Sequence, residues 1–450
     1  MAKITIFVDH DIIVRHFVLN RVLAPLEKEH EVVYVFPEHH RRVTVDPRSL
    51  PIPYHRAVAV SDDRAYLYRR LYHATVLRRL RRTRDKGPIF RFWKETLGVR
   101  GFWESWCYSW PITHAWYRRQ MLARIGESAP LNALLAEEKP EVILHPTVLE
   151  GLFVADLVRW GQAHGVPTIY LMNSWDNPAI KAMTVGVPDR LVVWGEHSKR
   201  LAHERLGIPI ERVVAFGAAQ FGVYREPPRE APARYRERLG VPAGVRLLLY
   251  AGSSKGLNET DHLCILERAI EAGELPNCRV LYRPHPWRDS LKGEADFFAL
   301  RWKHVIMAPD MAEYYRRRRA GEKGIYMADY AETHVTLSAI DAVISPLSTI
   351  LLEAAMHGKP IAAYLPDEDV RNNIAVLSMA KTVHFREFFE RVDCVLCERP
   401  EDLIRDCRQL LQVASRSSSS EQLKRQCEFF VEPADRSYAE LLGDLVRGVL

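Results

Sequence analysis

The region from residue 341 to residue 366 reads as a complete strand–helix–strand unit, and the rest of the chain is organised around it. Residues 342–344 are apolar and predict a buried strand. A polar turn then leads into a predicted helix that stops at Gly358, and residues 361–364 predict the next strand. Alternating strands and helices joined by short turns are typical of α/β folds with doubly wound sheets.

The same alternation runs through most of the 450 residues, enough for two domains with separate cores. We therefore predict an α/β fold of two Rossmann-like doubly wound domains that face a cleft. The N-terminal domain would span 1–222 and the C-terminal domain 244–412, with a linker at 223–243 and helices at 413–450 that pack back across this linker. The expected strands are residues 4–8, 31–36, 141–146, 167–171, 190–194, 212–216, 245–251, 280–282, 342–344, 361–364 and 393–397.

Polar residues follow several strands of the second half, where ligands bind in open α/β sheets. Arg283 and His285 are each followed by a proline, which holds the preceding residue extended, and both side chains suit an anion. Hydroxyls at the start of the helix after residue 344 suit a phosphate. The residues predicted to bind a nucleotide are Gly252, Ser253, Ser254, Arg283, His285, Ser345, Ser348, Thr349 and Glu353.

Each of these patterns also has a purely structural interpretation. A Ser-Thr pair before a helix is commonly a plain N-cap, and an Arg-Pro-His-Pro run can be a structural loop. The loop at 252–256 lacks the spacing of the established phosphate-binding glycine motifs. The combination of these features, in order and within one domain, favours a nucleotide-phosphate site.

Residues 64–125 form a basic and aromatic insertion that is predicted to be largely helical. Residues 64–100 carry 12 Lys or Arg against 2 acidic side chains, whereas the whole chain has a net charge of +6. Basic and aromatic side chains together suit an anionic membrane surface, and a solvated helical face over an aromatic core is the alternative. We expect no nucleic-acid partner, because no recognisable binding module accompanies the basic residues.

No apolar run is long enough for a membrane span, and the first residues predict a strand rather than a signal peptide. We therefore expect a cytoplasmic protein that can associate peripherally with the inner membrane face. No cluster of residues with metal-ligand spacing is evident, so we expect neither a metal nor a cofactor.

The arrangement resembles the GT-B glycosyltransferases. Arg-Pro-His-Pro at 283–286, followed by Ser-Pro-Leu-Ser-Thr at 345–349, is similar to motifs of bacterial sialyl- and Kdo-transferases and of the CDP-glycerol glycerophosphotransferases. The runs at 173–177, 188–195 and 207–217 look like the acceptor half of the same group. The carboxylate pattern of sialyltransferases, two acids followed by glycine, is absent from the N-terminal half, which leaves the sugar open.

The resemblance implies a CMP- or CDP-activated donor in the C-terminal domain. His285, Ser348 and Thr349 would then contact the donor phosphate, and Glu353 would bind the ribose. The predicted reaction is metal-independent transfer of a sugar to a hydroxyl of a surface-polysaccharide or lipid-linked acceptor. The alternatives are a polyol-phosphate transferase of the CDP-glycerol type, an enzyme like UDP-GlcNAc 2-epimerase, and a membrane-associated nucleotide-sugar-binding scaffold without catalysis.

Transfer requires stabilisation of the leaving nucleotide and a general base for the acceptor hydroxyl. Arg283 and His285 would stabilise the leaving group. Polar residues at strand ends of the N-terminal half are candidates for the base, and they are Asp9, His10, Asp11, His145, Glu150 and Asp176. Among these we favour Asp11, Glu150 and Asp176, although each of them also suits a helix cap or a turn.

Overall fold

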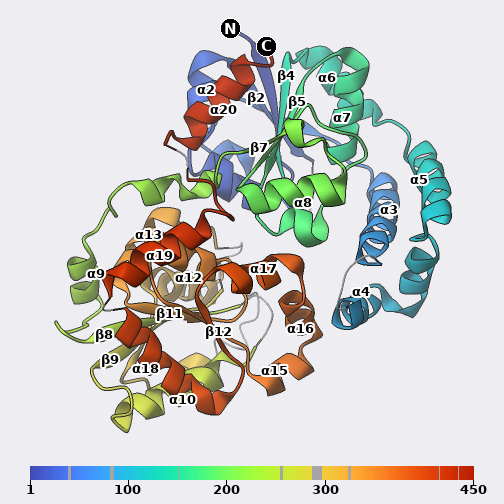
Figure 1. The fold of residues 1–450 in the computed structure, drawn as a ribbon. Coiled ribbons are helices and arrows are strands. Elements are labelled where there is room, and N and C mark those ends of the chain that lie inside the picture. The colour runs from blue at the N-terminus through green and yellow to red at the C-terminus, as the bar shows by residue number, and fades with distance from the viewer. Residues whose placement is uncertain are drawn as a thin grey trace. The chain divides into compact units, whose positions relative to one another are not determined.

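The computed structural model describes residues 1–38, 42–81, 86–151, 153–253, 257–285, 296–322, 326–414, 416–433 and 435–450. The chain forms two compact units, residues 1–222 with 429–450 and residues 223–428. Each unit contains one parallel sheet with helices on its faces (Figure 1). The prediction of two Rossmann-like α/β domains is therefore confirmed.

The sheet of the first unit has seven strands in the order β3-β2-β1-β4-β5-β6-β7, all parallel to their neighbours. Because the order reverses between β1 and β4, the connections after these two strands leave in different directions. The strands are β1 (Lys3–Phe7), β2 (Glu31–Pro37), β3 (His55–Val58), β4 (Val142–Thr147), β5 (Thr168–Met172), β6 (Arg190–Val193) and β7 (Val213–Ala215).

The helices of the first unit bury both faces of this sheet. Ile4 and Ile6 point into one apolar core and Phe7 into the other, which explains why β1 is almost continuously apolar. The helical segments are α1 (Asp11–Ile13), η1 (Val14–Val18), α2 (Ala24–Glu29), η2 (Pro47–Ser49), α3 (Asp62–Leu80), α4 (Lys86–Cys107), α5 (Pro111–Ile125), α6 (Ala129–Glu138), α7 (Phe153–His164), η3 (Asn177–Lys181), α8 (Glu196–Leu206), η4 (Ile210–Arg212) and α20 (Tyr438–Arg447). The short helix η5 (Ala219–Arg225) begins in the first unit and ends in the second.

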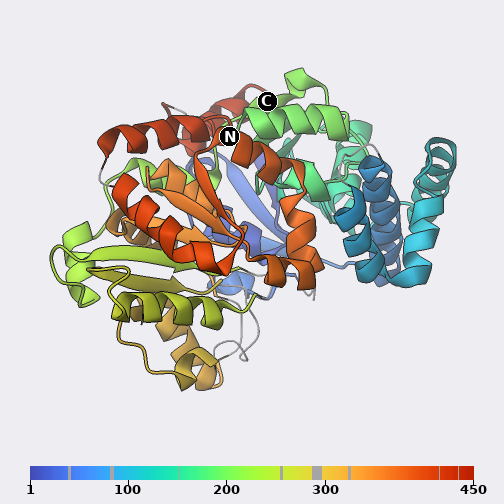
Figure 2. The ribbon, with the colours of Figure 1, turned by 60° about the horizontal axis from the view of Figure 1, so that its bottom comes forward.

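The insertion at 64–125 is helical, as predicted, and forms α3, α4 and α5 at one edge of the first unit (Figure 2). Helix α3 packs against both α4 and α5 through buried aromatic and aliphatic side chains. The axis of α4 breaks at Gly98, whose positive φ of 68° suits glycine. Within the ranges that the structure covers, no helix is both long and apolar enough to cross a bilayer.

The sheet of the second unit has six parallel strands in the order β10-β9-β8-β11-β12-β13 and reverses between β8 and β11. Its strands are β8 (Arg246–Ala251), β9 (Cys278–Arg283), β10 (Val305–Met307), β11 (Ala342–Ser345), β12 (Ile361–Tyr364) and β13 (Cys394–Cys397). Its helices are α9 (Pro232–Arg238), α10 (Glu259–Glu271), α12 (Pro309–Arg319), α13 (Tyr330–Ala339), α14 (Ile350–Met356), α15 (Asp367–Asn372), α16 (Ile374–Ala380), α17 (Val383–Arg391), η6 (Pro400–Asp402), α18 (Leu403–Val413) and α19 (Ser417–Cys427).

The C-terminal segment returns to the first unit after Glu428. Helix α19 still packs on α14 of the second unit, whereas α20 packs on α2, and Arg447 forms an ion pair with Glu29 at 2.8 Å. The expected linker at 223–243 lies within the second unit, where α9 packs on α13. Gly195 permits the return, because a Cβ there would lie 2.7 Å from the carbonyl carbon of Phe430.

Candidate functional site

The candidate nucleotide site lies where the strand order of the second sheet reverses. Strands β9, β8 and β11 are neighbours, so their carboxyl ends lie side by side. Arg283 ends β9, Ser253 follows β8, and Ser345 ends β11. The structure thus places predicted residues from three separate stretches of sequence at one edge of the sheet.

The loop after β8 is held by a buried glutamate at the start of α10. Glu259 accepts a hydrogen bond from the backbone N–H of Ser253 at 2.8 Å and one from the Tyr282 hydroxyl at 2.7 Å. A Cβ on Gly252 would lie 2.4 Å from a Glu259 carboxylate oxygen, so this approach requires glycine. Gly252 and Ser253 therefore have a fixed conformation, while Ser254 lies outside the described residues.

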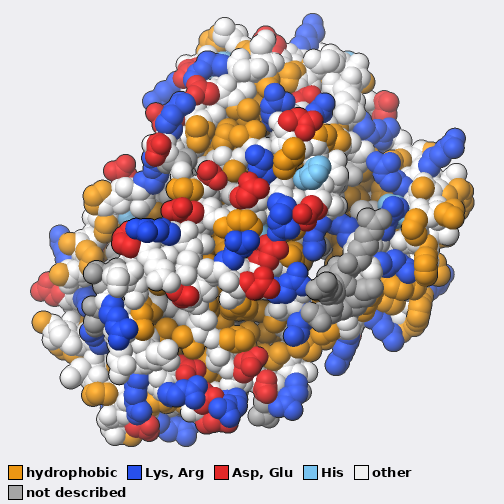
Figure 3. All heavy atoms as spheres, viewed as in Figure 1, with side chains coloured by type: hydrophobic (Ala, Val, Ile, Leu, Met, Phe, Trp, Pro, Cys, Tyr) orange, Lys and Arg blue, Asp and Glu red, His pale blue; other side chains and the backbone are white. Residues whose placement is uncertain are grey.

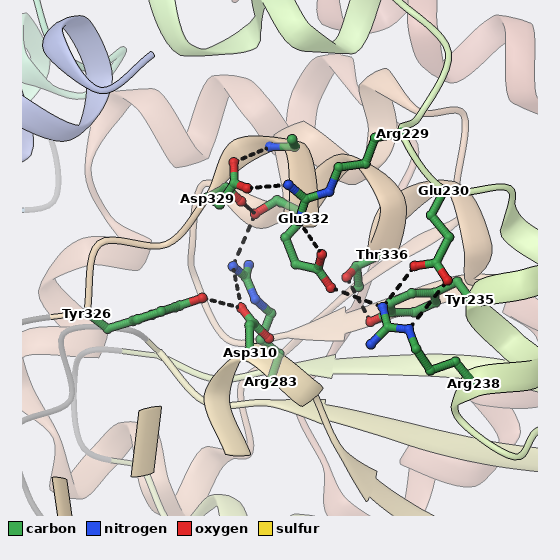
Figure 4. A network of polar contacts seen from close by, with 12 residues as sticks. Arg229, Glu230, Tyr235, Arg238, Arg283, Asp310, Tyr326, Asp329, Glu332 and Thr336 are labelled. Atoms are coloured by element: carbon green, nitrogen blue, oxygen red, sulfur yellow. Dashed lines mark hydrogen bonds and ion pairs between the residues drawn. The ribbon is translucent and has the colours of Figure 1, made fainter. Parts of the chain in front are cut away.

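Arg283 is buried and belongs to a polar network behind the strand end (Figure 4). Its guanidinium donates to the Thr333 hydroxyl at 3.1 Å and lies 3.6 Å from the Asp310 carboxylate, which also accepts a 2.9 Å hydrogen bond from Tyr326. These contacts connect β9 to α12 and α13. They give Arg283 a positioning role beside the predicted ligand role, and the half-exposed His285 follows it on the same strand end.

Around the start of α14 the predicted residues differ in their surroundings. Ser345 is fully buried, and its hydroxyl has no hydrogen-bond partner among the described residues. Ser348 and Thr349 are half-buried, and Thr349 is the N-cap residue of the helix. Glu353 is 8% exposed and accepts a hydrogen bond from the Tyr224 hydroxyl. Burial and the charge of Glu353 raise the pKa of Tyr224, which keeps this hydroxyl protonated as a donor.

The first unit has a cavity of about 70 Å³ at its own point of strand reversal. Asp9 follows β1, Glu150 and Gly151 follow β4, and Arg42 follows β2. Arg42 pairs with the Glu150 carboxylate at 2.9 Å. The cavity is lined by Asp9, Pro37, Arg42, Ala65, Tyr68, Arg69, Tyr72, Leu149, Glu150, Gly151, Phe153, Val154, Ala155, Met183 and Val185.

Asp9 is the most perturbed carboxyl group of this cavity. Burial raises its pKa to about 7, although the nearby positive charge of Arg42 acts in the opposite direction. Its Oδ1 has no hydrogen-bond partner among the described residues, and its Oδ2 lies 3.8 Å from Nε2 of His145. A Cβ on Gly151 would lie 2.5 Å from Oδ2, so glycine gives the carboxyl group its room.

His145 is a neutral neighbour of Asp9. Its Nδ1 lies 3.0 Å from the carbonyl oxygen of Phe7, and because a carbonyl only accepts, Nδ1 carries the proton. The lone pair of Nε2 therefore faces Asp9. Burial lowers the pKa of His145 to about 4, so this imidazole stays uncharged at neutral pH.

The three favoured general bases have different environments. Asp11 is buried and accepts hydrogen bonds from the backbone and hydroxyl of Thr44 and from the backbone of Val45, which is the pattern of a loop anchor. Asp176 is the N-cap residue of η3, and its carboxylate lies 3.5 Å from the ammonium group of Lys181. Glu150 lines the cavity. Asp9 is one of the six candidates from the sequence but not one of the three favoured, because no sequence signal distinguishes it from Asp11 and both follow the same strand.

Comparisons with known proteins give structural matches only. No protein-family model and no curated protein matches this sequence. Staphylococcus aureus MnaA with UDP aligns at a TM-score of 0.52 and 10% identity, covering 100% of this chain and 96% of MnaA. UDP-GlcNAc 2-epimerase of Neisseria meningitidis bound to UDP-GlcNAc aligns at 0.50 and 13%, covering 100% of both chains.

The wall teichoic acid polymerase TagF aligns at a TM-score of 0.49 and 11% identity, covering 99% of this chain and 88% of TagF, which supports no inference about function. The matches to MnaA and the epimerase show that this chain has their two-domain GT-B type of fold. Among the described residues, no group of three or more His, Cys, Asp or Glu side chains is placed to hold a metal ion.

The raised pKa of Asp9 predicts a pH-dependent stability. The folded protein keeps this proton between the ordinary pKa of an aspartate, about 4, and about 7, whereas the unfolded chain releases it. The contribution of Asp9 to the free energy of unfolding therefore falls as pH rises through this window, by a few kcal/mol at most. The side chain of Asp9→Asn stays neutral at every pH. The melting temperature of this variant should therefore rise relative to that of the wild type as the pH increases from 5 to 8.

The control for this measurement is Asp63→Asn, which removes an exposed carboxylate in the first turn of α3. Its melting temperature should stay at a constant offset from that of the wild type over the same pH range. A constant offset for Asp9→Asn as well would show that Asp9 is ionised in the folded protein throughout.

Proposed function

We propose that this protein is a glycosyltransferase that moves a sugar from a nucleotide-activated donor, CMP- or CDP-linked, to a hydroxyl of a polysaccharide or lipid-linked acceptor. The observation that carries the proposal is the convergence of Ser253, His285 and the Ser348–Thr349 turn at the ends of three adjacent parallel strands of the second unit. Ligands of open α/β sheets bind at such a point of strand reversal. No metal ion is needed in this proposal.

Each donor residue has a distinct task in this proposal. His285 and the hydroxyls of Ser348 and Thr349 bind the phosphate and stabilise the charge that develops on the leaving nucleotide. Glu353 accepts hydrogen bonds from the ribose hydroxyls, in the way that it accepts one from Tyr224. Arg283 holds the strand end in position through Thr333 and Asp310.

A UDP-GlcNAc 2-epimerase-like activity is the second candidate. It is favoured by the fold that the chain shares with the epimerase bound to UDP-GlcNAc and with MnaA bound to UDP. An epimerase converts its nucleotide sugar without any acceptor, so product analysis with the nucleotide sugar alone separates the two candidates.

The acceptor side of the proposal includes a membrane contact through α4 and α5. Trp103, Trp110, Ile112 and Trp116, which we call the tryptophan patch, are between 52% and 86% exposed. Exposed arginines lie on the same two helices, at positions 100, 118, 119 and 124. Figure 3 shows hydrophobic and basic side chains together at this edge. Tryptophan with arginine suits the interface of an anionic bilayer.

Part of the basic insertion has an internal role, as its structural interpretation expects. Arg64 pairs with Asp156, Arg70 pairs with Glu104, and the Arg81 guanidinium lies 3.4 Å from the ring centre of Trp106. The membrane proposal therefore rests on the exposed arginines and on the tryptophan patch, not on the net charge of the segment.

Nucleotides that bind the second unit should stabilise the protein. Thermal shift with CMP, CDP, UDP, GDP and ADP is expected to give its largest shift with CMP or CDP, because binding to the folded state adds about 2.7 kcal/mol at a hundredfold excess over Kd. His285→Ala should weaken this binding by about 10- to 100-fold, as expected for the loss of one charge-assisted hydrogen bond. His304→Ala, another partly exposed histidine of this unit, serves as the control and should bind like the wild type.

The largest shift with UDP would instead favour the epimerase candidate. The absence of any shift at millimolar nucleotide would contradict the donor site, and so would an unchanged shift in His285→Ala.

Removal of exposed apolar side chains should weaken membrane binding. In sedimentation with vesicles of phosphatidylcholine and phosphatidylglycerol at low salt, the double variant Trp103→Ser with Ile112→Ser should bind at least about tenfold less, since each side chain loses more than 1 kcal/mol of apolar burial. The control pair is Leu19→Ser with Ile210→Ser, at 43% and 41% exposure on the same unit. Equal loss in both pairs, or no vesicle binding by the wild type, would contradict the membrane contact.

A further inference from the structure

The cavity of the first unit combines features that a purely structural cavity does not need. It contains the Asp9 carboxyl group, which is 8% exposed and has a Oδ1 without a hydrogen-bond partner among the described residues. A buried polar atom without a partner is unfavourable by about 1–3 kcal/mol, so it calls for an explanation. Oδ1 itself is enclosed, whereas the side chain as a whole is 10% exposed and lines the cavity, so a ligand hydroxyl reaches the carboxyl group from that exposed side.

The residues around the Asp9 carboxyl group leave its Oδ1 without a hydrogen-bond partner among the described residues. Gly151 removes the Cβ that would collide with Oδ2. Nε2 of His145 lies 3.8 Å from Oδ2. Because the proton of this imidazole is on Nδ1, Nε2 cannot donate a hydrogen bond to the carboxylate. Arg42 on the loop after β2 is engaged by Glu150 of the loop after β4, so its charge is shared between two carboxyl groups.

The rest of the lining has the mixed character of a carbohydrate site. Leu149, Phe153, Met183 and Val185 give apolar walls, and the aromatic side chains of Tyr68 and Tyr72 come from α3. The charged or ionisable side chains besides the tyrosines are Asp9, Arg42, Arg69 and Glu150. Sugars and polyols present C–H faces to apolar walls and hydroxyls to polar groups, and the volume of about 70 Å³ accommodates the end of such a molecule.

We propose that this cavity binds the hydroxyl-bearing end of a sugar or polyol acceptor and that the Asp9 carboxylate is the general base for the attacking hydroxyl. This inference rests on the proposed glycosyltransferase function. In the step, the acceptor O–H proton moves to Asp9, and the oxygen forms a bond to the anomeric carbon of the donor. The bond from that carbon to the phosphate oxygen breaks, and the nucleotide leaves with the electron pair. Asp9 later releases its proton to water.

Two charged groups act on the titration of Asp9, and the other titratable groups that line the cavity or adjoin Asp9 are His145 and, from α3, Tyr68, Arg69 and Tyr72. Arg42 favours the carboxylate, Glu150 disfavours it, His145 is neutral near pH 7, and Tyr72 of α3 lines the same cavity as an uncharged phenol. Since a base acts only when it is deprotonated, the rate of transfer rises with pH and levels off above about 7.

The experiment measures release of nucleotide from the nucleotide sugar whose nucleotide stabilises the protein most, with glycerol and N-acetylglucosamine as probe acceptors, between pH 5.5 and 9. The wild type should show a rise in rate with a midpoint near pH 7. Asp9→Asn should lower the acceptor-dependent rate by at least about a hundredfold and lose this rise. Its nucleotide-induced thermal shift should equal that of the wild type, because the donor residues belong to the other unit.

A second variant tests the cavity without touching Asp9. Ala65→Phe adds an aromatic ring from α3 and should raise the KM for the probe acceptor by about tenfold while kcat changes little. Ala123→Phe on the exposed face of α5 is the matched control and should leave KM unchanged. An acceptor-dependent rate in Asp9→Asn with the wild-type pH profile, or an unchanged KM in Ala65→Phe, overturns the inference.

Failure of the proposed function would look different from failure of this inference. If no nucleotide stabilises the wild type, the glycosyltransferase proposal fails. The state of Asp9 is then still decided by infrared difference spectra between pH 5.5 and 8.5, in which the wild type should lose a protonated carboxyl band that Asp9→Asn lacks. Ionisation of Asp9 across this whole pH range would contradict its raised pKa and, with it, the rise in rate near pH 7 that this inference predicts.

Discussion

Both units depend on the same constraint, which is the reversal of strand order in a parallel sheet. The loops after β1 and β4 in the first unit, and after β8 and β11 in the second, leave the sheet in different directions. Parallel strands end at the same edge, so polar residues from distant parts of the chain meet there. Asp9 with Glu150, and Ser253 with Ser345, are brought together in this way.

Burial at these edges then decides what each residue can do. Glu259 is paired on both carboxylate oxygens and fixes the loop that carries Ser253, and Asp11 is used in full by the backbone and hydroxyl of residues 44 and 45. Asp9 is only two residues away from Asp11, yet it has an oxygen without a hydrogen-bond partner among the described residues and a pKa raised to about 7. Chemistry is expected where the fold buries a group without satisfying it.

Much of the fold can be predicted from the sequence because its parallel strands are apolar throughout. Two strands, β3 (His55–Val58) and β10 (Val305–Met307), are absent from the strands expected from the sequence. Both are short and lie at a sheet edge, where only one neighbouring strand pairs with them, and their run of apolar residues is too short to predict a strand. The nucleotide candidates could be predicted because they follow strands in recognisable turns. The cavity could not, because its lining comes from α3, from α7, from residues 183–185 and from the loops after β1, β2 and β4, and nothing local in the sequence brings these together.

The most direct test of the account is hydrogen exchange of the backbone amides with and without the nucleotide that stabilises the protein most. We predict slower exchange in the second unit, at residues 252–253, around Arg283 and His285, and from Ser345 to Glu353. Slower exchange confined to the first unit, or unchanged exchange at saturating nucleotide, would contradict the assignment of the donor site to this strand reversal.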